Sequence, residues 1–147
     1  MPQNKYKLPE DVKTACSAYV RGYKRLVYEY YQKRDIVLNA QKNNSIVNLT
    51  GGYNDSSEPL AKTMLLEKIE THIDTKIMRA VEQAMLHIGD DLPDENERVK
   101  LREAIIDCCK DRRQFVFRYY GLDMDKSTFY RRRNKFLYEI SKYLTEN

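Results

Sequence analysis

Apolar residues recur at alternating spacings of four and three along the N-terminal third of the chain, a pattern typical of one face of a helix. Pro9 suits the first position of such a helix, and the acidic residues Glu10 and Asp11 suit its positive end. The pattern predicts one long helix from Pro9 to about Gln41, ~50 Å long at about 1.5 Å per residue. Its apolar seam consists of Val12, Cys16, Tyr19, Tyr23, Leu26 and Tyr30, and Val37 extends it beyond Lys33.

A helix of this length cannot bury its seam on itself. It has to pack either on the rest of its own chain or on another copy, so self-association through the helix from Pro9 to Gln41 is one of two open expectations. The stretch from Asn39 to Ser57 is then rich in Asn, Gly and Ser, which predicts a linker. At most a short extended piece is expected there, from Ile46 to Leu49.

Helical periodicity returns in the middle of the chain. Ser57 is a good N-cap, Pro59 falls in the first turn, and Gly89 is a suitable end, so a second long helix is expected between them. Its apolar stripe would be Leu66, Ile69, Ile73, Ile77, Ala80, Ala84 and Ile88. After a connector, Asp94 and Glu97 resemble a capping box that opens a third helix. The core-facing residues of this third helix would be Leu101, Ala104, Ile105 and Cys108.

The C-terminal pattern is a short helix, a glycine turn and a longer basic helix. The short helix would run from about Arg112 to Tyr120 and end at Gly121, and either Asp125 or Ser127 would cap a last helix that reaches about Leu144. This order is typical of the helix-turn-helix motif, whose second helix enters the major groove by its N-terminal end. The whole pattern predicts an all-α fold in three consecutive segments, residues 1–57, 58–93 and 94–147.

Charge is distributed unevenly over these segments. The net charge is only +4, but residues 58–111 carry eight Lys and Arg against thirteen Asp and Glu, whereas residues 112–147 carry nine against four. A basic end of this kind suits a polyanionic partner.

The last helix separates its apolar and basic residues onto different faces. Its apolar side would hold Phe129, Phe136, Leu137, Ile140 and Leu144. Five basic residues lie between Lys126 and Lys135 with no acidic residue among them. On the outward side, Arg131 is placed to bond guanine O6 and N7, and Asn134 to pair with adenine. Arg133 falls on the apolar side instead and is expected to lie along the core or to pair with an acid of the third helix. The alternative is a basic face that only contacts solvent.

Other kinds of chemistry find no support in the residues. Three cysteines, without a C-x-x-C pair, and two histidines argue against both a disulfide framework and a zinc site. The chain has no phosphate-binding loop and no catalytic constellation, so we expect neither an enzyme nor a cofactor. No secretory signal and no apolar stretch of ~20 residues is present, which predicts a cytoplasmic protein without a membrane partner.

The C-terminal residues resemble a known family. The tail is similar to the C-terminal part of phage transcriptional regulators of the RinA and ArpU kind, which itself is similar to region 4 of sigma factors. The similarity rests on Tyr119-Tyr120-Gly121-Leu122, on Lys126-Ser127-Thr128-Phe129-Tyr130-Arg131-Arg132-Arg133, and on residues 136–144. Asn48-Leu49-Thr50-Gly51-Gly52, followed by a long helix, also looks like that family's Gly-Gly segment. One departure is that only Gly121 to Asp125 separate the Tyr-Tyr segment from the basic helix, where relatives place a distinct helix of about eight residues. Either the segment from Arg112 to Tyr120 is the first helix of the motif, or the motif is abbreviated.

The resemblance implies a sequence-specific, DNA-binding activator of late genes in a phage or prophage, acting in the cytoplasm of a bacterial host. Its partners would be double-stranded DNA and RNA polymerase. It implies base-facing roles for Ser127, Thr128, Tyr130, Arg131 and Asn134, and phosphate-facing roles for Lys126, Arg132 and Lys135. Two alternatives remain open: a DNA-binding phage packaging protein similar to a small terminase subunit, and a helical protein-interaction module that does not bind DNA.

Overall fold

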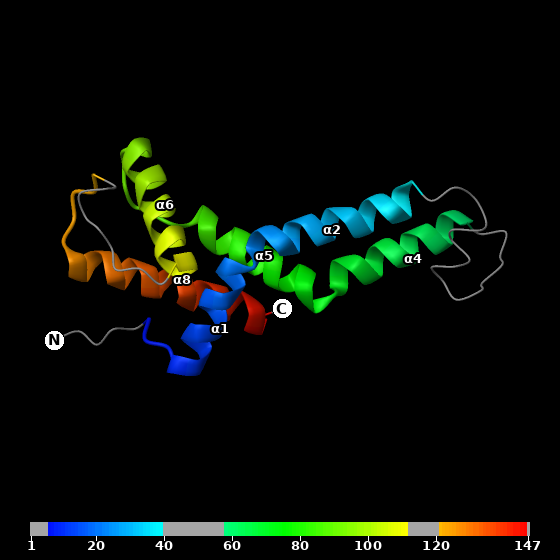
Figure 1. Ribbon diagram of the computed structural model, residues 1–147, viewed down its shortest axis with the longest axis horizontal. Coiled ribbons are helices and arrows are strands. Elements are labelled where there is room, and N and C mark those ends of the chain that lie inside the picture. Colours follow the sequence, from blue (N-terminus) through cyan, green and yellow to red (C-terminus); the bar gives the residue numbers. More distant parts are fainter. Residues whose placement is uncertain (1–5, 40–57, 112–120, 147) are drawn as a thin grey trace. The chain divides into compact units, whose positions relative to one another are not determined.

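The computed structural model describes residues 6–39, 58–111 and 121–146, and every regular element in these ranges is a helix (Figure 1). The all-α class is therefore confirmed. The helices are α1 (Glu10–Arg21), α2 (Tyr23–Leu38), α4 (Glu58–Thr71), α5 (Ile73–Leu86), α6 (Glu95–Asp111) and α8 (Lys126–Glu146). No helix in this part of the chain is long and apolar enough to cross a membrane. The extended piece expected from Ile46 to Leu49 and the short helix expected from Arg112 to Tyr120 lie outside the described residues.

The expectation of one continuous N-terminal helix is wrong, because Gly22 separates α1 from α2. The backbone N–H of Gly22 still donates to the Ala18 carbonyl at 3.0 Å, but the residue has left helical geometry, with ψ near 1°. Glycine gains less than any other residue except proline from staying in a helix, which makes it the weakest point of the seam. The seam itself is nevertheless the inward face. Its most buried members are Cys16, Leu26, Tyr30 and Val37, and Lys33 is exposed.

The second long helix is also divided, into α4 and α5, at His72. The Thr71 hydroxyl donates to the Glu67 carbonyl at 2.9 Å, and the Asp74 backbone N–H donates to His72 Nδ1 at 3.1 Å. The Thr71 hydroxyl also donates to the Lys68 carbonyl at 3.4 Å. The Lys68 carbonyl and the Asp74 N–H are groups that a helix end leaves open, so these side chains stabilise the break locally. Ile73, which the sequence placed on the apolar stripe, is 58% exposed as a consequence, whereas Ala80, Ala84 and Ile88 are buried.

The chain divides into two compact units. Unit 1 comprises Met1–Tyr23 and Ile77–Asn147, and unit 2 comprises Lys24–Lys76. Unit 1 therefore joins segments that are far apart in the sequence, unlike the three consecutive segments expected from composition and pattern.

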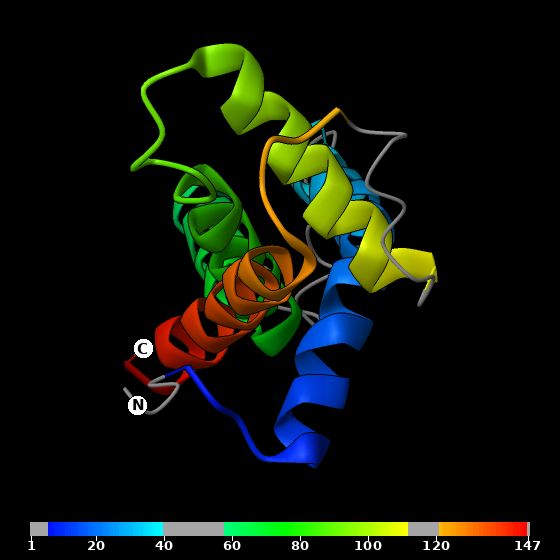
Figure 2. The same ribbon diagram turned by 90° about the vertical axis from the view of Figure 1, so that its left-hand side faces the viewer.

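In unit 1, α1 packs against α6 and α8, and α6 packs against α8 (Figure 2). The four expected inward residues of the third helix, Leu101, Ala104, Ile105 and Cys108, are all buried. Leu144 on the last helix is partly buried. Cys16 and Val20 of α1 belong to the same core, so the first part of the seam is buried by its own chain. Four residues of α8 complete this core: Phe129, Phe136, Leu137 and Ile140.

Turn and cap residues of unit 1 hold the helix ends. Gly89 has φ 72°, a left-handed conformation that favours glycine, and ends the turn after α5. Asp94 accepts from the Asn96 backbone N–H at 2.9 Å and caps α6 as expected. Asp125 accepts from the Thr128 backbone N–H at 3.0 Å, so Asp125 rather than Ser127 caps α8.

In unit 2, α2 and α4 lie side by side (Figure 1). The Tyr30 hydroxyl donates to the Glu70 carboxylate across the pair. The Thr75 hydroxyl, which is buried, donates to the Ile69 carbonyl at 2.6 Å and closes the bend between α4 and α5. These two hydrogen bonds thus add to the burial of Leu26, Tyr30 and Val37 in this unit.

Candidate nucleic-acid interface

Helix α8 packs its apolar side into the core of unit 1. Its apolar side is buried, with Phe129 and Ile140 fully covered, and its first turn is capped by Asp125. The hydrogen bonds with Thr128 hold the pKa of the Asp125 carboxyl below its usual range. The carboxylate is therefore engaged at the positive end of the helix, and the side chains that follow it project from a fixed backbone.

The N-terminal half of α8 presents an open basic surface. Lys126, Ser127 and Arg131 are exposed, and Thr128 is half-buried. Among the described residues neither Lys126 nor Arg131 forms an ion pair with an acid; Lys126 Nζ lies 5.9 Å from the centroid of the Tyr130 ring. Of the residues expected to contact DNA, Lys126, Ser127 and Arg131 are therefore the ones that are accessible to a ligand in solution.

Arg132 is engaged within the protein instead. Its Nη1 and Nη2 donate to the two carboxylate oxygens of Asp91, each at 2.8 Å, and 24% of the Arg132 side chain is exposed. This paired hydrogen bond lowers the pKa of Asp91 to about 2 and raises that of Arg132. Arg132 therefore fastens the connector between α5 and α6 to α8, and a phosphate would have to compete with Asp91 for it.

Arg133 lies against α6, on the side that its position in the helix indicated. Its guanidinium stacks 4.8 Å above the Tyr130 ring, and Nη1 donates to Cys108 Sγ at 3.8 Å. The Tyr130 ring in turn meets Phe129 edge-on, with centroids 5.4 Å apart. The Arg133 guanidinium thus occupies one face of the Tyr130 ring, where a base would have to compete with it.

The C-terminal half of the outward face of α8 is partly covered by the N-terminal segment. The Tyr6 ring packs edge-on against Tyr138, with centroids 5.4 Å apart, and Lys135 Nζ lies 6.0 Å from the Tyr6 centroid. Lys135 also pairs with Glu139 at 4.0 Å, and burial raises the pKa of that carboxyl. Asn134 lines a recess beneath the N-terminal segment. The sequence offered no local signal for this contact, because its partners come from opposite ends of the chain.

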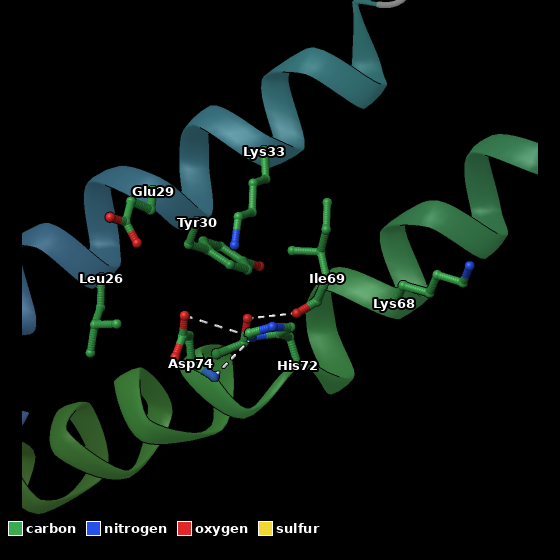
Figure 3. Close-up of a pocket in the computed structure, with 9 residues that line it drawn as sticks. Leu26, Glu29, Tyr30, Lys33, Lys68, Ile69, His72 and Asp74 are labelled. Atoms are coloured by element: carbon green, nitrogen blue, oxygen red, sulfur yellow. Dashed lines mark hydrogen bonds and ion pairs between the residues drawn. The ribbon is translucent and has the colours of Figure 1, made fainter. Parts of the chain in front are cut away.

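A second recess, of about 160 Å³, lies in unit 2 (Figure 3). Its walls include Tyr30, Lys33, His72 and Asp74, which point toward one another from α2 and from the bend between α4 and α5. His72 accepts the Asp74 N–H, and its Nδ1 is 3.8 Å from the Asp74 carboxylate. Since these groups cap the start of α5, their arrangement serves the bend.

The three cysteines are free thiols and all of them are buried in unit 1. Burial raises the pKa of Cys16 to about 11 and that of Cys109 to about 12, so both thiols stay protonated at neutral pH. Within residues 6–39, 58–111 and 121–146, no group of three His, Cys, Asp or Glu side chains could hold a metal ion.

Comparison with known proteins finds no relative: no protein family, curated protein or solved structure matches this chain. Its function is therefore inferred from the chemistry of its own surface.

Proposed function

We propose that this protein is a sequence-specific transcriptional regulator that binds double-stranded DNA through the N-terminal half of α8. The observation that carries the proposal is the exposed group Lys126, Ser127 and Arg131, in which neither cation forms an ion pair within the described chain, on a capped helix whose opposite side is the core of unit 1. A helix held in this way can enter the major groove by its N-terminal end without losing its packing.

The roles of these side chains follow from their chemistry. Arg131 offers the paired N–H donors that match guanine O6 and N7, so it is the main reader of sequence. Lys126, in the first turn, contributes attraction to a backbone phosphate. The hydroxyl groups of Ser127 and Thr128 bond either a base edge or a phosphate. Arg132 acts mainly through Asp91 by fixing the position of α8.

We infer a more specific role from the resemblance of the C-terminal residues to the RinA and ArpU regulators. In that role the protein activates late genes of a phage or prophage in the cytoplasm of its bacterial host, and RNA polymerase is its second partner. The resemblance covers Tyr119–Leu122 and much of α8, and the exposed basic surface described above lies within the same stretch.

A protein-interaction module is the second candidate. Several large apolar side chains of unit 2 are exposed, among them Tyr28 and Tyr31 on α2 and Met64 on α4. Such side chains suit a protein partner more than a polyanion. The two functions are compatible in one chain, because the apolar residues and the basic residues belong to different units.

The test is a binding titration at several salt concentrations. The probes are a duplex enriched from a random library on the wild-type protein and a scrambled version of it. Arg131→Ala should cost about 1–3 kcal/mol on the enriched duplex and much less on the scrambled one. Lys126→Ala should weaken binding to both similarly and reduce the salt slope by about one.

Arg133→Ala is the matched control, since it removes the same side chain two positions further along α8. It should lower the melting temperature more than it changes sequence preference, because Arg133 packs on Tyr130 and Cys108. If Arg133→Ala abolishes selective binding at unchanged stability while Arg131→Ala has no effect, α8 meets DNA by another face. If no duplex is enriched and no salt-sensitive binding is seen, the proposed function is wrong.

A further inference from the structure

The N-terminal segment before α1 contacts α8 through Tyr6 and then leads away to the start of α1 (Figures 1 and 2). Tyr6 anchors it through the Tyr138 ring and through Lys135, and Leu8 packs against the core of the unit. The segment therefore has a defined place beside the side chains of α8 that follow Arg131.

This placement brings two further lysines to the basic side of α8. A recess of about 250 Å³ is lined by Lys7 and Lys13 from the N-terminal side, and by Asn134 and Leu137 from α8. Lys7 is exposed and Lys13 is half-buried. In the part of the chain that the structure describes, no ion pair involves either lysine. The acid that shares the recess is Glu10, so the lysines keep a positive surplus there.

The dimensions of a duplex indicate what these lysines would meet. Asn134 is eight residues beyond the start of α8, which corresponds to ~12 Å along the helix. The major groove is about 8.5 Å deep, so a side chain ~12 Å from the inserted end of such a helix lies beyond the base edges, at the level of the bordering phosphates. Side chains beside Asn134 are therefore placed at the edge of the groove, where the ligand is a backbone phosphate rather than a base.

We propose that Lys7 and Lys13 bind backbone phosphates of the duplex that Arg131 reads, which makes the N-terminal segment a second DNA-contacting element. This inference rests on the proposed function of α8. Asn134, which the segment flanks and whose Oδ1 accepts from Arg133 Nη2 at 3.4 Å, then serves as part of the platform for the segment rather than as a reader of adenine.

The test measures salt dependence on the enriched and scrambled duplexes. Lys7→Ala and Lys13→Ala should each reduce the salt slope by about 0.9 on both duplexes, and the double variant by about twice that amount. A slope difference of 0.9 corresponds to a ~3.5-fold smaller loss of affinity between 50 mM and 200 mM salt. Lys68→Ala, which removes the same charge from α4 in unit 2, is the control and should leave the slope within error of the wild type.

Tyr6→Ala distinguishes a segment that binds phosphate from a segment that only covers α8. If the segment contributes phosphate contacts, the loss of its anchor weakens binding, and Lys7→Ala has little further effect in that background. If the segment instead only covers α8, Tyr6→Ala strengthens binding, which overturns the proposal. Unchanged slopes for both lysine variants, alongside the expected loss for Arg131→Ala, overturn it as well and leave the function of α8 standing. A wild-type protein that fails to bind any duplex refutes the function itself.

Discussion

The two units of this protein bury their apolar residues very differently. Unit 1 has a continuous core to which α1, α5, α6 and α8 all contribute. In unit 2 the buried residues of the described chain are Leu26, Tyr30, Val37 and Thr75. Seven of the nine large apolar side chains that are exposed in the described chain belong to unit 2. They are Tyr28, Tyr31, Ile36, Leu38, Leu60, Met64 and Ile73.

The difference shows how much a third packed helix adds to the burial of apolar surface. Two helices that lie side by side share a single interface, so each has a large remainder of surface outside it. In unit 1, α6 and α8 each have more than one neighbour, and their apolar sides are covered. Since burial of apolar surface dominates stability, we expect unit 1 to set the global free energy of unfolding and unit 2 to open at a lower cost.

Equal leucine truncations in the two units test this comparison most strongly. Leu137→Ala removes a side chain that is 1% exposed in unit 1 and should lower the free energy of unfolding by about 2–5 kcal/mol. Leu60→Ala removes one that is 56% exposed in unit 2 and should change it by less than about 0.5 kcal/mol. Urea denaturation followed by circular dichroism measures both. Similar losses for the two variants would show that unit 2 is as tightly packed as unit 1.

Charged substitutions on the two sides of the unit boundary give an intermediate effect. Leu26→Asp places a carboxylate at a buried position of unit 2 and should cost about 1–3 kcal/mol, limited by the local opening of that unit. Tyr23→Asp affects a side chain packed against the core of unit 1 and should destabilise that unit. Hydrogen exchange read by peptide separates the outcomes: Leu26→Asp should expose amides of α2 and α4 while those of α6 and α8 stay protected. Protection that is unchanged in both variants would show that the seam is not a buried face.

Two ion pairs, Arg132–Asp91 in unit 1 and Arg25–Glu29 in unit 2, give the smallest expected effects on stability. Asp91→Asn should lower the free energy of unfolding at pH 7, because the pKa of Asp91 falls from 3.8 to about 2 on folding. More than half of the Asp91 side chain is exposed, so solvent screening reduces the effect to about 1 kcal/mol. A depressed pKa stabilises the folded state above the unfolded value, so the difference from wild type should vanish as the pH falls from 4 to 2.

Glu29→Gln is the control for this experiment. Glu29 pairs with Arg25 one turn away on α2, with side chains 38% and 63% exposed, and such a pair contributes about 0.3 kcal/mol. Urea denaturation at pH 7 and at intervals down to pH 2 measures both variants. An effect of Glu29→Gln as large as that of Asp91→Asn would mean that the bond between Arg132 and Asp91 does not hold α8 in place.

Local sequence signals predicted the helical elements better than their ends. The caps at Asp94 and Asp125 were among the expected ones, because a capping carboxylate acts on a backbone N–H two or three residues away. The breaks at Gly22 and His72 were not expected. The free energy of continuing a helix through either residue differs from that of ending it there by only about 1 kcal/mol. Tertiary packing of the flanking helices is large enough to outweigh this difference.

The sequence by itself determined the apolar faces of α6 and α8, since the helical period fixes the direction of every side chain along one element. It therefore indicated both the buried residues of α8 and the exposed position of Arg131. Only the tertiary structure decided which polar groups are already engaged: Arg132 by Asp91, 41 residues away, and the surface around Asn134 by the segment that holds Tyr6. A helical period gives the direction in which a side chain points, but what lies opposite depends on contacts between distant parts of the chain, and these form only when the chain has folded.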